Sequence, residues 1–280
     1  MDIAVFLAVL AAAACHAGWN AVVKGGGDPM VTTAIVSVAA AIVSLPFVPI
    51  AGLPAVAAWP WIAASVVVHL LYFGCLIEAY NHGDLGQVYP LARSTAPLMT
   101  GMAGSLIGEY LTVTAWAGLL LLVGGVLLLA LPGRGGDARF NWRGIGFALA
   151  TAVTICAYSI IDGVGARASG YSPAYTLALF IGCGVVMMLY ALARRGRTVF
   201  AGAGHRWRIG LLGGVMQVVS YGVANWAMTL APIAIVAALR ETSVLFDSLI
   251  AVIVLKEKLH TARIAAAVLI VCGLIVLRIA

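Results

Sequence analysis

Long apolar stretches follow one another along the whole chain and are separated by short breaks rich in glycine, proline and charged residues. Each stretch is close to the roughly 20 residues that an α-helix needs to cross the hydrocarbon core of a bilayer. The pattern predicts ten membrane-spanning helices, at residues 2–23, 30–50, 58–82, 85–107, 112–131, 143–162, 173–193, 207–230, 232–255 and 260–278. The predicted fold class is therefore an all-α integral membrane protein without a soluble domain.

The span at 85–107 contains Arg93 and two prolines, Pro90 and Pro97. A central arginine costs roughly 2.5–3.5 kcal/mol on membrane-insertion scales, and each proline frees a backbone carbonyl. We expect this helix to be kinked and to face protein or water rather than lipid. Transporters build substrate sites from helices that are interrupted in this way.

The second half of the chain repeats the first. An offset of 148 residues aligns Arg93 with Glu241 and Glu109 with Glu257. The same offset also aligns Ala79 with Ala227, Leu91 with Leu239, Thr95 with Ser243, Leu111 with Leu259, and Gly125 with Gly273. We divide the chain into a first repeat (1–131), a linker (132–142) and a second repeat (143–280), with five spans in each repeat. An odd number of spans inverts the second repeat relative to the first, and a substrate site is expected between them.

Composition supports a membrane protein: 63% of the residues are hydrophobic and 9% are charged. The net charge of +6 comes mainly from connections after the fifth, seventh and ninth spans. Basic connections report orientation and contact with anionic lipid, so we expect lipid as a partner and no nucleic acid. Because these connections share one side, opposite to both termini, the charge pattern places the termini outside the cell.

Several polar side chains lie within the spans and share helix faces. His16, Trp19 and Asn20 do so in the first span, as do His69 and Tyr72 in the third. The sixth span carries Tyr158, Ser159 and Asp162, which echo Trp19 and Asn20. Gln217, Tyr221 and Asn225 form a stripe along the eighth span, and Gln217 is offset by 148 residues from His69. Such faces line a cavity or bond neighbouring helices, and both interpretations stay open.

Charged groups are the other candidates. Arg93, Arg240 and Glu241 either contact substrate or form an ion pair that is needed only for folding. Glu78 and Glu241 are candidates for proton coupling. Glu109 is interpreted mainly as an interfacial residue or as a helix-start residue for the following span.

The five cysteines, Cys15, Cys75, Cys156, Cys183 and Cys272, lie in apolar spans without metal-ligand spacing. We interpret them as small core residues and expect no metal and no cofactor. The glycines of the fifth and seventh spans, including Gly182 and Gly184, are interpreted as helix-packing positions.

Four motifs carry a family resemblance: HAGWN at residues 16–20, YPLAR at 89–93 with the later Pro97, Gly108-Glu109 echoed by Lys256-Glu257, and the glycine spacing from Gly118 to Gly125. The chain resembles the EamA family of the drug/metabolite transporter superfamily. The resemblance implies ten helices in two inverted repeats around a central cavity, cytoplasmic termini, and alternating access for a small metabolite. By position it implies substrate contacts at Trp19, Asn20, Tyr89, Arg93, Tyr158, Tyr221 and Glu241.

The leading hypothesis is a secondary transporter of an amino acid or amine, working in the export direction as a monomer or homodimer in the inner (plasma) membrane. The alternatives are an intramembrane lipid-modifying enzyme and a non-transporting membrane subunit. The chain shows no strong catalytic cluster, so we expect no enzyme activity. It also lacks a P-loop, which argues against ATP hydrolysis.

Overall fold

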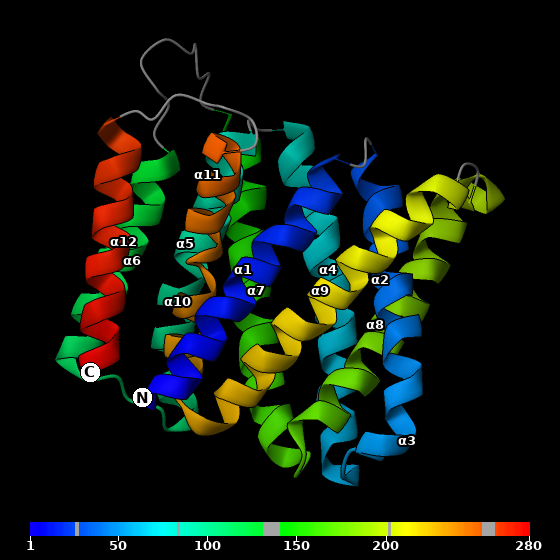
Figure 1. Cartoon of the computed structure of the whole chain (residues 1–280), viewed down its shortest axis with the longest axis horizontal. Coiled ribbons are helices and arrows are strands. Elements are labelled where there is room, and N and C mark those ends of the chain that lie inside the picture. The colour runs from blue at the N-terminus through cyan, green and yellow to red at the C-terminus, as the bar shows by residue number, and fades with distance from the viewer. Residues whose placement is uncertain (26–27, 83–84, 131–140, 201–202, 254–260) are drawn as a thin grey trace. The chain divides into compact units, whose positions relative to one another are not determined.

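The structure is a computed structural model that describes residues 1–25, 28–82, 85–130, 141–200, 203–253 and 261–280. Within these ranges it contains helices and no strand (Figure 1). The α-helices are α1 (Ile3–Gly25), α2 (Pro29–Ser44), α3 (Val48–Ala51), α4 (Trp59–His82), α5 (Leu85–Gly104), α6 (Val113–Ala130), α7 (Trp142–Ala168), α8 (Ser172–Arg195), α9 (Ala203–Leu230), α10 (Ile233–Arg240), α11 (Ser243–Ile253) and α12 (Thr261–Ile279). Helical structure falls in every expected span.

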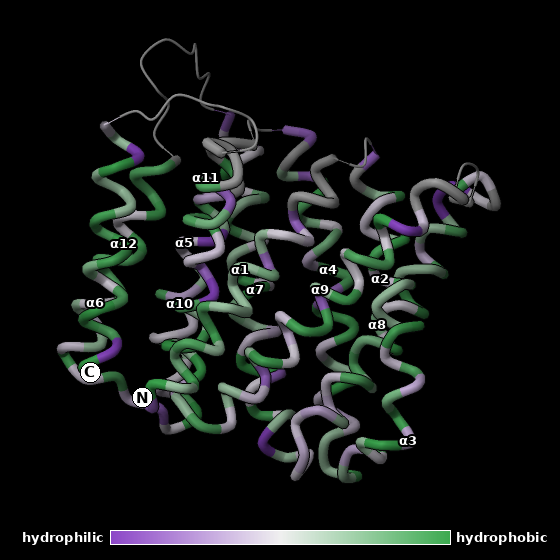
Figure 2. Tube along the Cα trace, viewed as in Figure 1, coloured by the Kyte–Doolittle hydropathy of each residue, from purple (hydrophilic) through white to green (hydrophobic). Residues whose placement is uncertain are grey.

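Among the described residues, six helical segments are long and apolar enough to cross a membrane: Ile3–Asn20, Met30–Ala51, Val56–Ala79, Trp142–Ala168, Ser172–Arg195 and Thr261–Ile279. Val113–Leu129 of α6 is apolar but shorter. The segments α5, α9, α10 and α11 are not among the six, because polar residues interrupt α5 and α9 and because α10 and α11 are short. Figure 2 shows a mostly hydrophobic trace, with hydrophilic positions at the helix ends and also within some helices. The chain is thus a multi-pass membrane protein, and the count of ten spans remains a prediction.

The proline-containing span is continuous in the structure. Pro90 and Pro97 both lie inside α5, which runs unbroken from Leu85 to Gly104. The expected kink stays a prediction, because a helix can bend at a proline without ending there. A break in the helix occurs in the equivalent segment of the second repeat, where α10 ends at Arg240 and α11 begins at Ser243.

A tight turn at Glu241 and Thr242 makes this break. The Glu241 amide donates to the Ala238 carbonyl at 3.0 Å, and the Thr242 amide donates to the Leu239 carbonyl at 3.1 Å. The Thr242 hydroxyl also donates to the Leu239 carbonyl, at 2.7 Å. Bonds that span three residues tighten the chain locally, and hydroxyl bonds to the backbone compete with regular helix. Glu241 is thus held in a turn rather than in a helix.

The chain forms two compact units. The first unit comprises residues 1–10, 71–160 and 230–280, and the second comprises residues 11–70 and 161–229. Each unit takes helices from both expected repeats, because helices at matched positions of the two repeats pack together. These pairs are α6 with α12 and α5 with α10 in the first unit, and α2 with α8 in the second (Figure 1).

In the first unit, α6 and α12 pack through small residues. A Cβ atom on Gly125 would lie 2.5 Å from Ile270 Cγ1 and 2.9 Å from the Ala266 carbonyl oxygen. A Cβ atom on Gly118 would lie 3.1 Å from the Gly273 carbonyl oxygen. The repeat offset aligns Gly118 with Ala266 and Gly125 with Gly273, so the two contacts are counterparts of each other. The helices therefore run antiparallel with two-fold symmetry, as expected of inverted repeats.

Glu109 caps a helix of the other repeat. Its Oε2 accepts a hydrogen bond from the Ile233 amide at 2.8 Å, at the first residue of α10. The Thr112 hydroxyl accepts from the Ala115 amide at 3.1 Å and so caps α6. Glu109 thus stabilises the start of α10, where a negative charge opposes the positive end of the helix dipole, while Thr112 serves the next span.

In the second unit, glycines bring helices into close contact. A Cβ atom on Gly184 of α8 would lie 2.5 Å from the Ala41 Cβ and 2.8 Å from the Ser37 carbonyl oxygen on α2. A Cβ atom on Gly182 would lie 2.9 Å from Val66 on α4. The interpretation of Gly182 and Gly184 as packing positions is therefore confirmed. Close backbone contact of this kind is how helices associate in a bilayer.

Candidate functional site

A buried ion pair joins the two expected repeats in the first unit. Arg93 Nε donates to Glu241 Oε2 at 2.6 Å, and Arg93 Nη2 donates to Ser243 Oγ at 3.2 Å. Arg93 and Glu241 are 4% exposed each. The alignment of Arg93 with Glu241 placed opposite charges at matching positions of the repeats, and the structure brings these charges together.

The environment of this pair makes it strong. Arg240 is buried as well, and its guanidinium attracts Glu241. Every residue from Ile233 to Val244 is buried, so α10 has no exposed face. In a low-dielectric interior the attraction between the charges is strong, and removing one partner leaves an uncompensated buried charge.

Aromatic and acidic candidates of α4 also lie in the first unit. Tyr72 and Tyr158 are buried, and their rings meet edge to face with centroids 5.7 Å apart. Glu78 lies in the last turns of α4, where its side chain is 43% exposed and its Oε2 is 3.6 Å from His82 Nδ1. The predicted proton-coupling role of Glu78 stays a prediction for a partly exposed group.

A buried carboxylate organises the polar residues of the second unit. Asp162 of α7 is 0% exposed, and its Oδ1 accepts a hydrogen bond from the Tyr175 hydroxyl of α8 at 2.8 Å. Its Oδ2 accepts from the Tyr221 hydroxyl of α9. Tyr221 in turn meets His69 and Phe180 edge to face, with ring centroids 5.8 Å away in both cases.

The rest of the predicted stripe on α9 has separate partners. Asn225 is 1% exposed and donates from Nδ2 to Thr176 Oγ1 at 3.1 Å. Gln217 Oε1 is buried without a hydrogen-bond partner among the described residues. Within the second unit, Tyr221 and Asn225 therefore bond to α7 and α8, which is the helix-bonding alternative, while Gln217 retains an open acceptor.

The structure places His16, Trp19 and Asn20 on one face of α1, as predicted. Trp19 Nε1 donates to His16 Nδ1 at 3.2 Å, and the two rings lie edge to face with centroids 5.2 Å apart. His16 and Asn20 are buried. Tyr89 lies in α5, but its side chain is outside the part of the chain that the structure describes.

Asp162, which bonds to the predicted Tyr221, and Tyr175, which bonds to Asp162, were not among our candidate site residues. Asp162 was noted only as an echo of the first span, although an ionisable residue inside a span is itself a functional signal. Tyr175 carried no signal, because a tyrosine near the start of a span is typical of the membrane interface. Their pairing depends on how α7 and α8 pack.

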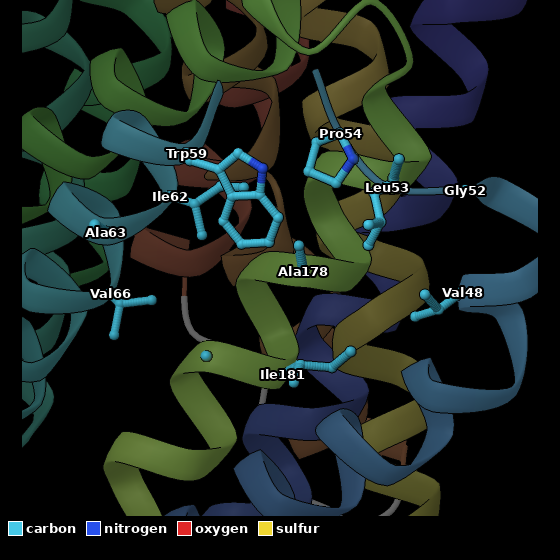
Figure 3. A pocket seen from close by; sticks show the side chains of 12 residues that line it. Val48, Gly52, Leu53, Pro54, Trp59, Ile62, Ala63, Val66, Ala178 and Ile181 are labelled. Atoms are coloured by element: carbon cyan, nitrogen blue, oxygen red, sulfur yellow. The ribbon is translucent and has the colours of Figure 1, made fainter. Parts of the chain in front are cut away.

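The second unit also holds a pocket of about 580 Å³ that is lined almost entirely by apolar atoms (Figure 3). Its walls come from the chain around α3, from α4 and from α8, and they include Trp59, Val66 and Ile181. Side chains of this kind suit a lipid acyl chain rather than a polar metabolite. The polar clusters around Arg93 and Asp162 are therefore the better candidates for a transported solute.

Comparisons with known proteins agree with this architecture. The EamA-like transporter family matches twice, at residues 3–131 and 142–279. A solved structure titled "Crystal structure of protein" is 19% identical, covers 97% of this chain and 94% of its own, and superimposes with a TM-score of 0.77, which shows a shared fold. No curated protein matches the chain. The chain belongs to the EamA-like transporter family, a part of the drug/metabolite transporter superfamily.

Proposed function

We propose that this protein is a secondary transporter that exports a small polar or amphipathic metabolite, an amino acid or amine, by alternating access in the plasma membrane. Family membership supports transport rather than enzyme activity. The observation that carries the choice of substrate is the buried pair of Arg93 and Glu241.

An amino acid is a suitable ligand for this pair because it carries both charges. Breaking a buried ion pair by removing one partner costs about 3–5 kcal/mol, since the other charge stays buried and unpaired. A zwitterion avoids this cost: its carboxylate binds Arg93 while its ammonium group binds Glu241. A substrate with only one charge pairs with either Arg93 or Glu241 and leaves the other charge without this partner.

The position of the pair links binding to movement. Arg93 lies on α5 of the first repeat, and Glu241 lies in the turn between α10 and α11 of the second. A zwitterion that replaces the direct bond at 2.6 Å separates the two side chains and releases the repeats from each other. Such an exchange gives the substrate a differential affinity for two arrangements, which alternating access requires.

The other predicted residues are proposed as further substrate contacts. The group consists of His16, Trp19, Asn20, His69, Tyr72, Tyr89, Tyr158, Gln217, Tyr221, Asn225 and Arg240. Among them Gln217 has a buried acceptor open to a donor group, and the aromatic rings offer faces to an ammonium group.

Counterflow in proteoliposomes tests the proposal. Proteoliposomes that contain the purified protein are loaded in separate samples with zwitterionic amino acids, with amines, or with phosphorylated metabolites. The exchange of the loaded compound for its labelled form is then measured. We expect exchange of amino acids above all. Well-folded protein that exchanges none of the three classes would contradict the proposed substrate class.

Two variants separate substrate binding from folding. Arg93→Ala removes the hydrogen-bonded ion-pair partner of Glu241 and is expected to lose both exchange and stability. The double variant Arg93→Met with Glu241→Met removes both charges and keeps side-chain volume, and such replacements are often neutral or stabilising. If the double variant folds and still exchanges amino acids, the pair is structural. Arg195→Ala, which breaks the exposed pair with Asp28, is the matched control and should exchange normally.

A further inference from the structure

The first unit carries a groove of about 430 Å³ along α12, which we call the α12 groove. Its walls come from the end of α6, from α11 and from α12, and they include Leu129, Leu249, Arg263, Val268 and Cys272. Almost all of the atoms that line it are apolar. Arg263 is the charged member of the described lining, whereas the pocket of the second unit has no charged residue among its described walls.

The α12 groove is open to the outside of the unit. Leu249 of α11 and Ile264, Val268 and Val271 of α12 line the groove and are exposed. In a multi-pass membrane protein, exposed apolar side chains along a spanning helix contact the acyl chains of the lipid. The apolar part of the groove is therefore suited to an acyl chain.

The length of the groove matches one leaflet of the bilayer. With 19 residues, α12 is about 28 Å long, close to the roughly 30 Å of the hydrocarbon core. The lining residues of α12 extend from Arg263 to Cys272, nine residues or about 13 Å along the axis. One leaflet contributes roughly 15 Å to the core. The groove thus extends from one end of α12 to about the middle of the bilayer.

The charge of the groove lies at the end where a lipid headgroup is found. Arg263 is the third residue of α12, which begins at Thr261, and it is partly buried. A guanidinium group has five N–H donors, so it can bind a phosphate in a bidentate manner and still keep a protein partner. No acidic residue is among the described residues that line the groove. The lining therefore combines a positive end with an apolar body.

We propose that the α12 groove binds a phospholipid with a net negative headgroup, whose phosphate pairs with Arg263 and whose acyl chain lies between α11 and α12. A zwitterionic phospholipid is bound less well, because its headgroup also carries a positive charge that Arg263 repels. The site is separate from the pair of Arg93 and Glu241 and does not depend on which solute is transported. Because the lipid contacts both helices, its binding stabilises the folded first unit.

Native mass spectrometry of the full chain, freed of lipid in detergent, tests the proposal. Phosphatidylglycerol and phosphatidylcholine with identical acyl chains are added in separate titrations. We expect phosphatidylglycerol to bind more tightly. Arg263→Gln should reduce this preference about fivefold, the usual effect of one basic residue near a membrane surface, and should leave the binding of phosphatidylcholine unchanged. Arg263→Lys keeps the positive charge and should keep most of the preference.

Two control variants separate the headgroup from the acyl chain. Arg143→Gln removes an exposed positive charge outside the groove and should leave the preference unchanged. Equal losses for Arg143→Gln and Arg263→Gln would mean that only the net charge of the protein attracts the lipid, which overturns the proposal. Ala267→Phe fills the groove and should weaken the binding of both lipids. Binding that is unaffected by Ala267→Phe also overturns it.

Photocrosslinking locates the lipid on the unaltered protein and needs no variant to fold. The probe is phosphatidylglycerol with a diazirine at the end of one acyl chain. We expect crosslinked peptides from α12 around Val268–Cys272 and from α11 around Leu245–Leu249, and excess phosphatidylglycerol should compete better than phosphatidylcholine. Crosslinks found only on other helices overturn the proposal. A dimer of the chain that excludes the probe from α12 also overturns it, because the groove is then covered by a second copy. Neither result depends on whether the protein transports amino acids.

Discussion

The packing contact between α6 and α12 allows a prediction about stability, because two adjacent glycines of α6 have completely different surroundings. A Cβ atom on Gly125 would lie 2.5 Å from Ile270 Cγ1 and 2.9 Å from the Ala266 carbonyl oxygen. A Cβ atom on Gly124 would meet nothing within 4 Å. Gly125→Ala and Gly124→Ala therefore form a matched pair in the same helical turn.

The expected magnitudes follow from these distances. An extra methyl group in a close-packed contact costs typically about 1–3 kcal/mol, and here one of the atoms that must move belongs to the backbone. In an open helical position, alanine is favoured over glycine by roughly 0.5–1 kcal/mol. We expect Gly125→Ala to lower the free energy of unfolding by about 1–3 kcal/mol and Gly124→Ala to leave it unchanged or slightly higher.

The assay is reversible unfolding in mixed micelles, followed by tryptophan fluorescence and circular dichroism. Gly273→Ala provides a symmetry control, because its Cβ atom would lie 2.6 Å from the Leu122 amide nitrogen in the same contact between α12 and α6. It should behave like Gly125→Ala. Equal stabilities for Gly124→Ala and Gly125→Ala would refute the close antiparallel packing of α6 and α12.

Two further predictions concern charged groups at the helix ends. Glu109→Ala leaves the Ile233 amide without its acceptor, so the free energy of unfolding should fall by about 1–3 kcal/mol, while Glu109→Gln should lose at most about 1 kcal/mol because it keeps an acceptor oxygen; equal losses in the same assay would contradict the cap. The Arg195 side chain is 53% exposed, and its Nη2 lies 2.9 Å from Asp28 Oδ2. Arg195→Ala should therefore change stability by at most about 1 kcal/mol, and the change should shrink when unfolding is repeated at high salt.

The helices and the ion pair were predictable from the sequence, for different reasons. Apolar stretches of bilayer length predict spans because a lipid-exposed backbone must satisfy its own hydrogen bonds. The pairing of Arg93 with Glu241 followed from the repeat, since residues near a two-fold axis meet their own counterparts. Both signals are properties of the whole chain and need no knowledge of side-chain packing.

The break at Glu241 and the bonds of Asp162 were not predictable in the same way. Proline chemistry favours a kink at Pro90 and Pro97, and helix α5 continues through both residues. The actual turn depends on Thr242, whose hydroxyl bonds to the backbone at 2.7 Å, and threonine is too common in helices to signal a break. The partners of Asp162 are two neutral tyrosines that lie 13 and 59 residues away in the sequence, so no match of opposite charges pointed to them.

The repeat symmetry predicts that the central ion pair tolerates reversal. Arg93→Glu alone places two carboxylates together and should cost at least the roughly 3–5 kcal/mol of a broken buried pair. Adding Glu241→Arg restores opposite charges. Ser243, which accepts from Arg93 at 3.2 Å, is aligned with Thr95 in the other repeat, so a hydroxyl is present on either side.

We therefore expect the double variant to recover more than half of the stability that Arg93→Glu loses, measured by unfolding in mixed micelles. A coupling energy of this kind between Arg93 and Glu241 is what a double-mutant cycle isolates. Comparing the normal protein with the charge-reversed double variant also tests the proposed zwitterionic substrate. A zwitterion carries both charges and fits the reversed pair only if it binds in the opposite orientation. Losses that simply add would show that the surroundings, and not the attraction between the two charges, determine the stability of this part of the first unit.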